Sequence, residues 1–140
     1  MIVSGTIIDE GASVSILSST SWQEIGSPSL MHVTQNLLGF NKGTSRPLGI
    51  LPKLPITLRR RNVHLNVMVV QRPLDYNLLL DCDYVYNMEA IVSTFYWLMC
   101  FPHEGKIVTV DQLSFPGSST TPIQTSSLNG PIVSRVSLQP

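Results

Sequence analysis

The stretch Ile7-Ile8-Asp9-Glu10-Gly11-Ala12-Ser13 places an acidic side chain directly after an apolar segment and before a run of small residues. Polar neighbours are usual for an acid in an exposed loop, whereas hydrophobic residues here lead the carboxylate of Asp9 to the interior side of a turn. Burial raises the free energy of ionising such a group. Gly11 lets the backbone approach closely, so its N–H is predicted to hold the carboxylate. Taken alone, Asp-x-Gly is also typical of a simple turn at the end of a strand.

The residues from 2 to 110 form short apolar runs separated by turn residues, which predicts many short strands. Prolines within residues 50–58 exclude a helix interior there. Residues 63–70 begin with strict alternation, as in a half-buried strand. Between these two runs, Arg59-Arg60-Arg61-Asn62 is interpreted as a hairpin turn. The apolar Leu78-Leu79-Leu80 suits a central strand.

A second hairpin is predicted from residues 97–101 and 106–110, which flank Pro102-His103-Glu104-Gly105. The apolar-rich run from Ala90 to Phe101 is interpreted as buried strand material. It is too short to cross a bilayer, which needs roughly 20 residues. We therefore expect no membrane anchor.

Two short helices are predicted, one near residues 18–26 with a serine cap and a glycine stop, and one within residues 83–90. From Ser114 onward the composition changes to Ser, Thr, Pro, Gly and Gln without periodicity. We therefore expect one folded domain over residues 1–112 and a flexible tail or linker over residues 113–140.

The 140-residue chain has 9 basic and 9 acidic side chains, so no overall field favours nucleic acid or an anionic membrane. The N-terminus lacks the pattern of a signal peptide. Cys82 and Cys100 do not form a disulfide framework, which favours a reducing, cytoplasmic compartment. Arg59-Arg60-Arg61 is interpreted as a solvated turn, with contact to RNA as the alternative.

The Asp9-Glu10-Gly11-Ala12-Ser13 motif resembles the catalytic motif of retropepsins, and Tyr76 to Val85 resembles their second signature. Residues 33–43 are similar to the strand and flap of the family, and residues 56–70 to the hairpin that follows. The pattern looks closest to the protease region of gypsy-type long-terminal-repeat retrotransposon polyproteins. It implies an all-β fold, a small closed barrel that is half of a pepsin-type fold, with one or two short helices.

The resemblance implies an aspartic endopeptidase that cleaves extended polypeptide during polyprotein processing, without a cofactor or metal. Asp9 would be catalytic, in a homodimer that brings two such residues together. Gly11 and Ala12 would line the site, and the loop near Gly43 would close over the substrate as a flap. No nucleic-acid or membrane partner is expected of this domain.

Two residues depart from the family pattern. Glu10 stands where Ser or Thr normally connects the two catalytic loops, and it would bring two negative charges to a symmetric dimer interface. Asp81 stands where glycine is usual, and it would be strained if that position required a positive φ. About one strand precedes Asp9, whereas the family usually has more, so a truncated N-terminus is left open. The alternative function is a catalytically inactive dimerisation or peptide-binding module.

Other site chemistries have weaker support. Asp81-Cys82-Asp83 would fit a hard cation, but no phosphate-binding glycine loop accompanies it. The three histidines show no zinc-ligand spacing. Ser13 and Ser15 lack the surroundings of a serine-hydrolase elbow. Cleavage preference is not predicted by these motifs.

Overall fold

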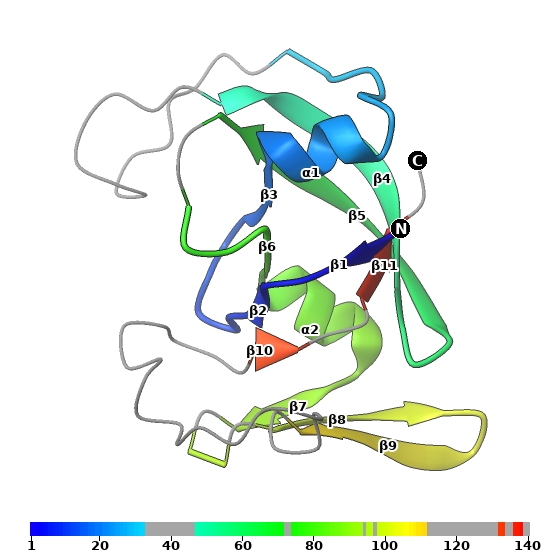
Figure 1. The fold of residues 1–140 in the computed structure, drawn as a ribbon. Coiled ribbons are helices and arrows are strands. Elements are labelled where there is room, and N and C mark those ends of the chain that lie inside the picture. Colours follow the sequence, from blue (N-terminus) through cyan, green and yellow to red (C-terminus); the bar gives the residue numbers. More distant parts are fainter. Residues whose placement is uncertain are drawn as a thin grey trace.

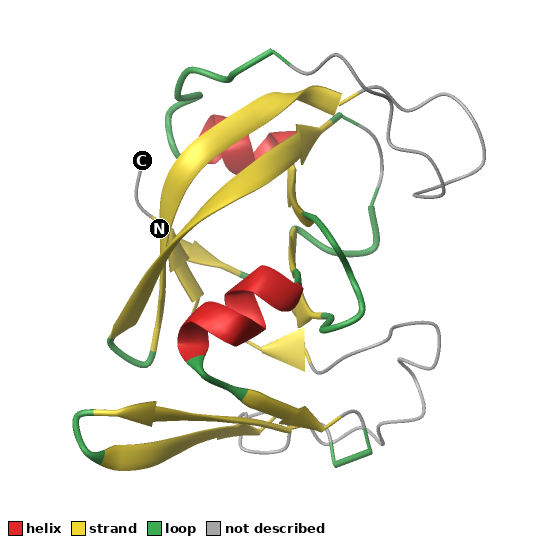
Figure 2. Ribbon diagram, turned by 180° about the vertical axis from the view of Figure 1, so that it is seen from behind, coloured by secondary structure: helices red, strands yellow, loops and turns green. Residues whose placement is uncertain are grey.

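The computed structural model describes residues 1–32, 47–71, 74–93, 95–96, 98–111, 132–133 and 136–138. These residues form strands and two short helices (Figures 1 and 2). The elements in chain order are β1 (Ile2–Val3), β2 (Thr6–Ile8), β3 (Ser15–Ser18), α1 (Ser19–Glu24), β4 (Pro47–Leu58), β5 (Arg61–Val70), β6 (Leu78–Leu80), α2 (Cys82–Met88), β7 (Ile91–Ser93), β8 (Leu98–His103), β9 (Lys106–Asp111), β10 (Ile132–Val133) and β11 (Val136–Leu138). The predicted all-β class with two short helices is confirmed.

Eight of these strands form one sheet in the order β1-β11-β4-β5-β3-β6-β2-β10. The sheet curls into a nearly closed barrel (Figure 1). Apolar side chains from most of its strands fill the interior, among them the fully buried Leu17, Ile56 and Leu80, and Tyr84 of α2 packs with them. Burial of this apolar surface is the main source of stability. The barrel that the resemblance implied is therefore present.

Strands β4 and β5 form a long antiparallel hairpin, as the alternating pattern predicts. Its turn consists of Arg59 and Arg60, both with positive φ, at 49° and 72°. Two successive positive φ values suit the right-handed twist of a two-residue hairpin, but asparagine and glycine are the residues that adopt them most readily. A positive φ is uncommon for arginine.

Each helix begins where a side chain accepts a backbone N–H. Ser18 Oγ accepts from Ser21 N at 3.2 Å at the start of α1, and Asp81 Oδ1 accepts from Tyr84 N at 3.1 Å at the start of α2. The C-cap of α2 is Glu89, which is left-handed at φ 55°. Both helices lie close to their predicted positions. In the described part of the chain, no helix has the length and apolar character needed to span a membrane.

The second sheet has the order β7-β8-β9 and packs part of one face on the core through Met99, Phe101 and Val110. The interpretation of residues 90–101 as buried strand material is wrong for several of them. Exposed fractions are 73% for Ile91, 81% for Phe95 and 65% for Tyr96. A three-stranded sheet at the edge of a barrel has only one side to bury, so its edge strand β7 and the following turn face outward.

Strands β10 and β11 lie within the stretch predicted as a tail, but they pair with the barrel. β10 pairs with β2, and β11 lies between β1 and β4. Val136 and Leu138 are fully buried. These two strands are therefore part of the folded barrel, whereas the prediction placed them in a flexible tail. A few apolar residues within a polar stretch are enough to add a strand to a sheet. The remainder of the predicted tail lies outside the described residues.

One arginine of the predicted basic turn connects the two sheets. The Arg61 guanidinium donates to the carbonyl oxygens of Pro102, in β8, and of Asn87, in α2, the latter at 3.0 Å. It also lies 3.2 Å from Glu89 Oε1. The interpretation of all three arginines as solvated is therefore wrong for Arg61, whose side chain is only 20% exposed. Burial raises the pKa of the Tyr84 phenol, and the positive charge of Arg61 lowers it by a smaller amount.

Candidate active site

The parallel pairing of β2 with β6 positions the Asp9 loop. Ile8 lies opposite Leu80 in this pair, so both strands end at the same edge of the sheet. Asp9 and Asp81 follow them directly. The backbone N–H of Asp9 donates to the carbonyl of Leu80 at 2.9 Å, which continues the ladder into the loop. The carboxylate of Asp9 is therefore positioned by a hydrogen-bonded strand and not by an unpaired loop.

The Asp9 carboxylate is partly exposed and held at one oxygen. Asp9 Oδ1 accepts a hydrogen bond from the backbone N–H of Gly11 at 2.9 Å, as predicted. Partial exposure leaves the rest of the carboxyl group accessible to water, a substrate or a second carboxylate. This geometry fits a group that exchanges protons.

Three further hydrogen bonds donated by backbone N–H groups fix the loop. Ala12 N donates to the carbonyl of Asp9 at 3.1 Å, and Cys82 N donates to the carbonyl of Ala12 at 3.0 Å. The buried hydroxyl of Ser15 accepts from Asp81 N at 3.1 Å. The loop is therefore joined to the first turn of α2. Such pre-organisation matters because a misplacement of 1 Å at a catalytic group can cost about 100-fold in rate.

Asp81 is a helix cap in this structure. Its φ is −91°, within the ordinary range, so the positive φ on which the expected strain depended is not present. The side chain is 4% exposed, and its carboxylate accepts from Tyr84 N. Aspartate at this position provides an N-cap, which stabilises a helix by about 1 kcal/mol relative to alanine and by only a few tenths relative to glycine. Asp81 is thus a structural residue that supports the loop.

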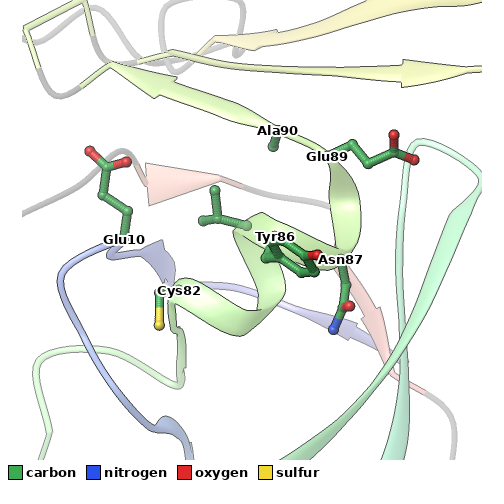
Figure 3. Close-up of a pocket in the computed structure, with 7 residues that line it drawn as sticks. Glu10, Cys82, Tyr86, Asn87, Glu89 and Ala90 are labelled. Atoms are coloured by element: carbon green, nitrogen blue, oxygen red, sulfur yellow. The ribbon is translucent and has the colours of Figure 1, made fainter.

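Glu10 is exposed and lines a hollow of about 740 Å³ between the Asp9 loop and α2 (Figure 3). The other lining residues are Cys82, Val85, Tyr86, Asn87, Glu89 and Ala90. In Figure 3 the Glu10 carboxylate and the Cys82 thiol point away from each other. Tyr86 is 82% exposed at this hollow. A partly apolar hollow with two carboxylates therefore adjoins the loop that carries Asp9.

The structure brings Asp9, Gly11 and Ala12 together as the motif predicts. Gly43, predicted in the flap, lies outside the described residues. Two supporting parts were not predicted: the Ser15 hydroxyl that holds Asp81 N, and β10, which pairs beside β2. The apolar pair Ile132-Val133 within a polar stretch is the signal that points to β10. No signal in the sequence identifies the partner of Ser15.

Within the described ranges, no group of three or more His, Cys, Asp or Glu side chains is placed to hold a metal ion. The Asp-x-Asp alternative also loses its first ligand, because the Asp81 carboxylate is buried and caps α2. The site consists of the Asp9 carboxylate and the backbone N–H of Gly11, which donates a hydrogen bond to it.

The barrel, its two short helices and the Asp9 loop at the end of a buried strand define a retropepsin-like fold. Among solved structures, the chain is similar to the retroviral protease-like domain of Ddi1 from Leishmania major, with a TM-score of 0.58 and 15% sequence identity. The match covers 86% of this chain and 97% of that one. No protein-family model and no curated protein matches the sequence. At this identity the likeness shows the fold alone.

Gly11→Ala tests how the Asp9 carboxylate is held. A methyl group at Gly11 would lie 3.3 Å from Asp9 Oδ1, so the carboxylate must shift by a few tenths of an ångström. We expect the fold to persist and any peptide cleavage to fall by about 10-fold, because a small misplacement is amplified in rate. Steady-state cleavage of a fluorogenic peptide measures this. The control is Ser29→Ala, an alanine substitution at an exposed position outside the loop. Equal activity of Gly11→Ala and the parent would contradict the assigned role.

Proposed function

We propose that this chain is one subunit of a homodimeric aspartic endopeptidase. The observation that carries the proposal is the carboxylate of Asp9, bound by Gly11 N at 2.9 Å at the end of a buried strand in a retropepsin-like barrel. Gly11 and Ala12 form the adjoining floor. The substrate is an extended polypeptide, which pairs its backbone with exposed strands.

The reaction needs two carboxyl groups that share one proton. The ionised one takes a proton from water, and the protonated one donates a hydrogen bond to the scissile carbonyl. Two like charges in close contact push the pKa values of the pair apart, which creates these two states. Each subunit supplies one Asp9, so a two-fold axis must pass beside the Asp9 loop.

The exposed apolar residues near this loop support a dimer. From the hollow beside Glu10, the surface continues through Tyr86 and Ala90 to Ile91. Phe95 and Tyr96 follow β7 and contact each other with ring centroids 4.9 Å apart. Large exposed apolar patches usually mark interaction surfaces. The second copy of the chain is the partner we propose for this surface.

The alternative is a module that keeps the fold without turnover, and Glu10 favours it, because a glutamate stands where the family has a hydroxyl. Incubation with an unfolded protein at acidic pH, with and without a pepstatin-like inhibitor, separates the two. Inhibitor-sensitive cleavage supports the endopeptidase. A dimer that cleaves at no pH supports the module and contradicts the enzyme.

Glu10→Ser tests the dimer interface. The exposed Glu10 carboxylate adjoins the Asp9 loop, so a two-fold axis there brings two negative charges together. Serine removes this repulsion and restores a hydroxyl donor, and we expect the dimer Kd to fall by about 10-fold. Sedimentation at several concentrations measures the Kd, with Glu24→Ser on α1 as the control for an exposed glutamate. Equal Kd values for Glu10→Ser and the parent would remove this interpretation.

We also propose the retroelement context. The order of the Asp9 motif, the flap region and the second signature is similar to that in gypsy-type retrotransposon proteases. Processing of a polyprotein is the role that this context supplies. Incubation of the active dimer with a polyprotein fragment that spans a domain junction tests it: discrete cleavage at the junction supports the role, and exclusive cleavage of unfolded substrates contradicts it.

A further inference from the structure

Two hairpin tips that are distant in sequence lie next to each other at one end of the molecule. The β4–β5 turn belongs to the barrel, and the β8–β9 turn belongs to the three-stranded sheet. Figures 1 and 2 show both tips on the side away from the β2–β3 connection, which carries Asp9. Arg61 fixes their relative position through its bonds to β8 and to the end of α2.

A hollow of about 290 Å³ lies between the tips, and most of its lining is basic. It is lined by Arg59, Arg60, His103, Glu104, Lys106 and Val108. Glu104 Oε1 is 3.7 Å from His103 Nε2, so the carboxylate adjoins the imidazole. Within the described part of the chain, the side chains of Arg59, Arg60 and Lys106 take part in no hydrogen bond or ion pair. Three cations therefore share this hollow with the single carboxylate of Glu104.

The conformation of the β4–β5 turn is a second and independent observation. Arg59 and Arg60 both adopt positive φ, where asparagine and glycine fit best. The neighbouring tip has the same signs of φ and places glycine at its second position, Gly105. Two arginines in succession are therefore unfavourable for the turn itself. Their charge gives a physical reason for their presence.

We infer that this basic hollow binds the phosphate backbone of a nucleic acid. A phosphate backbone requires cations and little else, and it binds without a deep pocket. A peptide recognised through its side chains would need apolar anchors within the site, whereas Val108 is the only apolar residue among the described residues that line the hollow. Ile107 is exposed but is the neighbour of two lining residues, so strand alternation points it to the opposite face. A bilayer would therefore not contact the cations and this apolar side chain together.

The inference revises the expectation that the domain has no nucleic-acid partner. That expectation used the net charge of zero, which averages over the molecule. In the fold, Arg59, Arg60 and Lys106 meet at one end, while Asp9, Glu10 and Asp83 belong to the Asp9 loop and the start of α2. A bound polyanion would leave the Asp9 loop free. The inference does not depend on the proposed peptidase activity.

The test is fluorescence anisotropy of a short labelled oligothymidylate titrated with the full chain at low salt. Three phosphate contacts predict a slope of about −2 for log K against log salt. The double variant Arg59→Asn with Arg60→Gly should lose at least about 10-fold in affinity and about two thirds of the slope, because it removes two of three contacts. Its melting temperature should rise, since the turn gains favourable residues. Loss of binding in a more stable protein separates this role from a structural one.

Two matched variants complete the design. Lys53→Gln removes an exposed cation elsewhere on β4 and should leave the affinity unchanged. Asp9→Asn should also bind as the parent does. Unchanged affinity in the turn variant, or an equal loss in Lys53→Gln, would overturn the inference. Stronger binding to phosphatidylserine vesicles, or displacement by polyglutamate as effective as by unlabelled oligonucleotide, would overturn the assignment to nucleic acid.

Discussion

Asp9→Asn is expected to lower kcat/KM for peptide cleavage by at least about 1,000-fold, because a positioned proton donor or acceptor contributes about 100- to 10,000-fold. In a homodimer the substitution removes both catalytic carboxyl groups at once. The asparagine side-chain oxygen can still accept from Gly11 N, which lies 2.9 Å from Asp9 Oδ1 in the parent chain. The fold should therefore persist, and circular dichroism checks this.

The control for this experiment is Asp83→Asn, which removes an exposed carboxylate from the first turn of α2. Cleavage by this variant should stay within about 2-fold of the parent, since exposed charges away from a reacting group have small effects. Two results would contradict the assignment of Asp9: cleavage retained in Asp9→Asn, or an equal loss in both variants.

Arg61→Met is expected to lower the free energy of unfolding by about 2–3 kcal/mol, because hydrogen bonds from a charged donor contribute about 1.5–3 kcal/mol and do not add fully. Arg61 donates to the carbonyl oxygens of Pro102 and Asn87, and methionine leaves both without this donor. The ion pair with Glu89 adds little, since the Glu89 side chain is 71% exposed. Urea unfolding followed by tryptophan fluorescence measures the difference.

Arg60→Met is the matched control, because Arg60 lies in the adjacent turn and is exposed. Its free energy of unfolding should stay within about 0.5 kcal/mol of the parent. Hydrogen exchange should in addition become faster in β8 and β9 of Arg61→Met, because the second sheet loses its connection to the hairpin. If the two variants unfolded at the same urea concentration, Arg61 would not have the connecting role described above.

Local sequence signals predict the elements that are determined locally. The hairpin tip at Glu104 follows from the glycine beside it, and the start of α1 from its serine cap, both of which act within a few positions of the chain. The tip at Arg59 follows from the apolar pattern of the two flanking strands. The Asp9–Gly11 bond is similarly local, since it spans two residues. These features could therefore be read from short motifs.

The missed features depend on long-range contacts. Val136 and Leu138 pack in the core because β11 pairs with β1 on one side and with β4 on the other. Hydrophobicity alone also predicts the wrong burial for Ile91 and Phe95, which are exposed because their sheet has one buried face. The partners of Arg61 are 26 to 41 residues away along the chain, and no spacing rule predicts them.

The pairing of β1 with β11 has a mechanical consequence. Met1 and Leu138 exchange hydrogen bonds, with Leu138 N donating to the carbonyl of Met1 at 2.8 Å. The two strands are antiparallel, so a pull that separates the chain ends loads their hydrogen bonds one after another, as in opening a zipper. Each strand is only two or three residues long. We therefore expect tension to peel this pair apart at low force and to uncover the edge of β11 before the rest of the barrel yields.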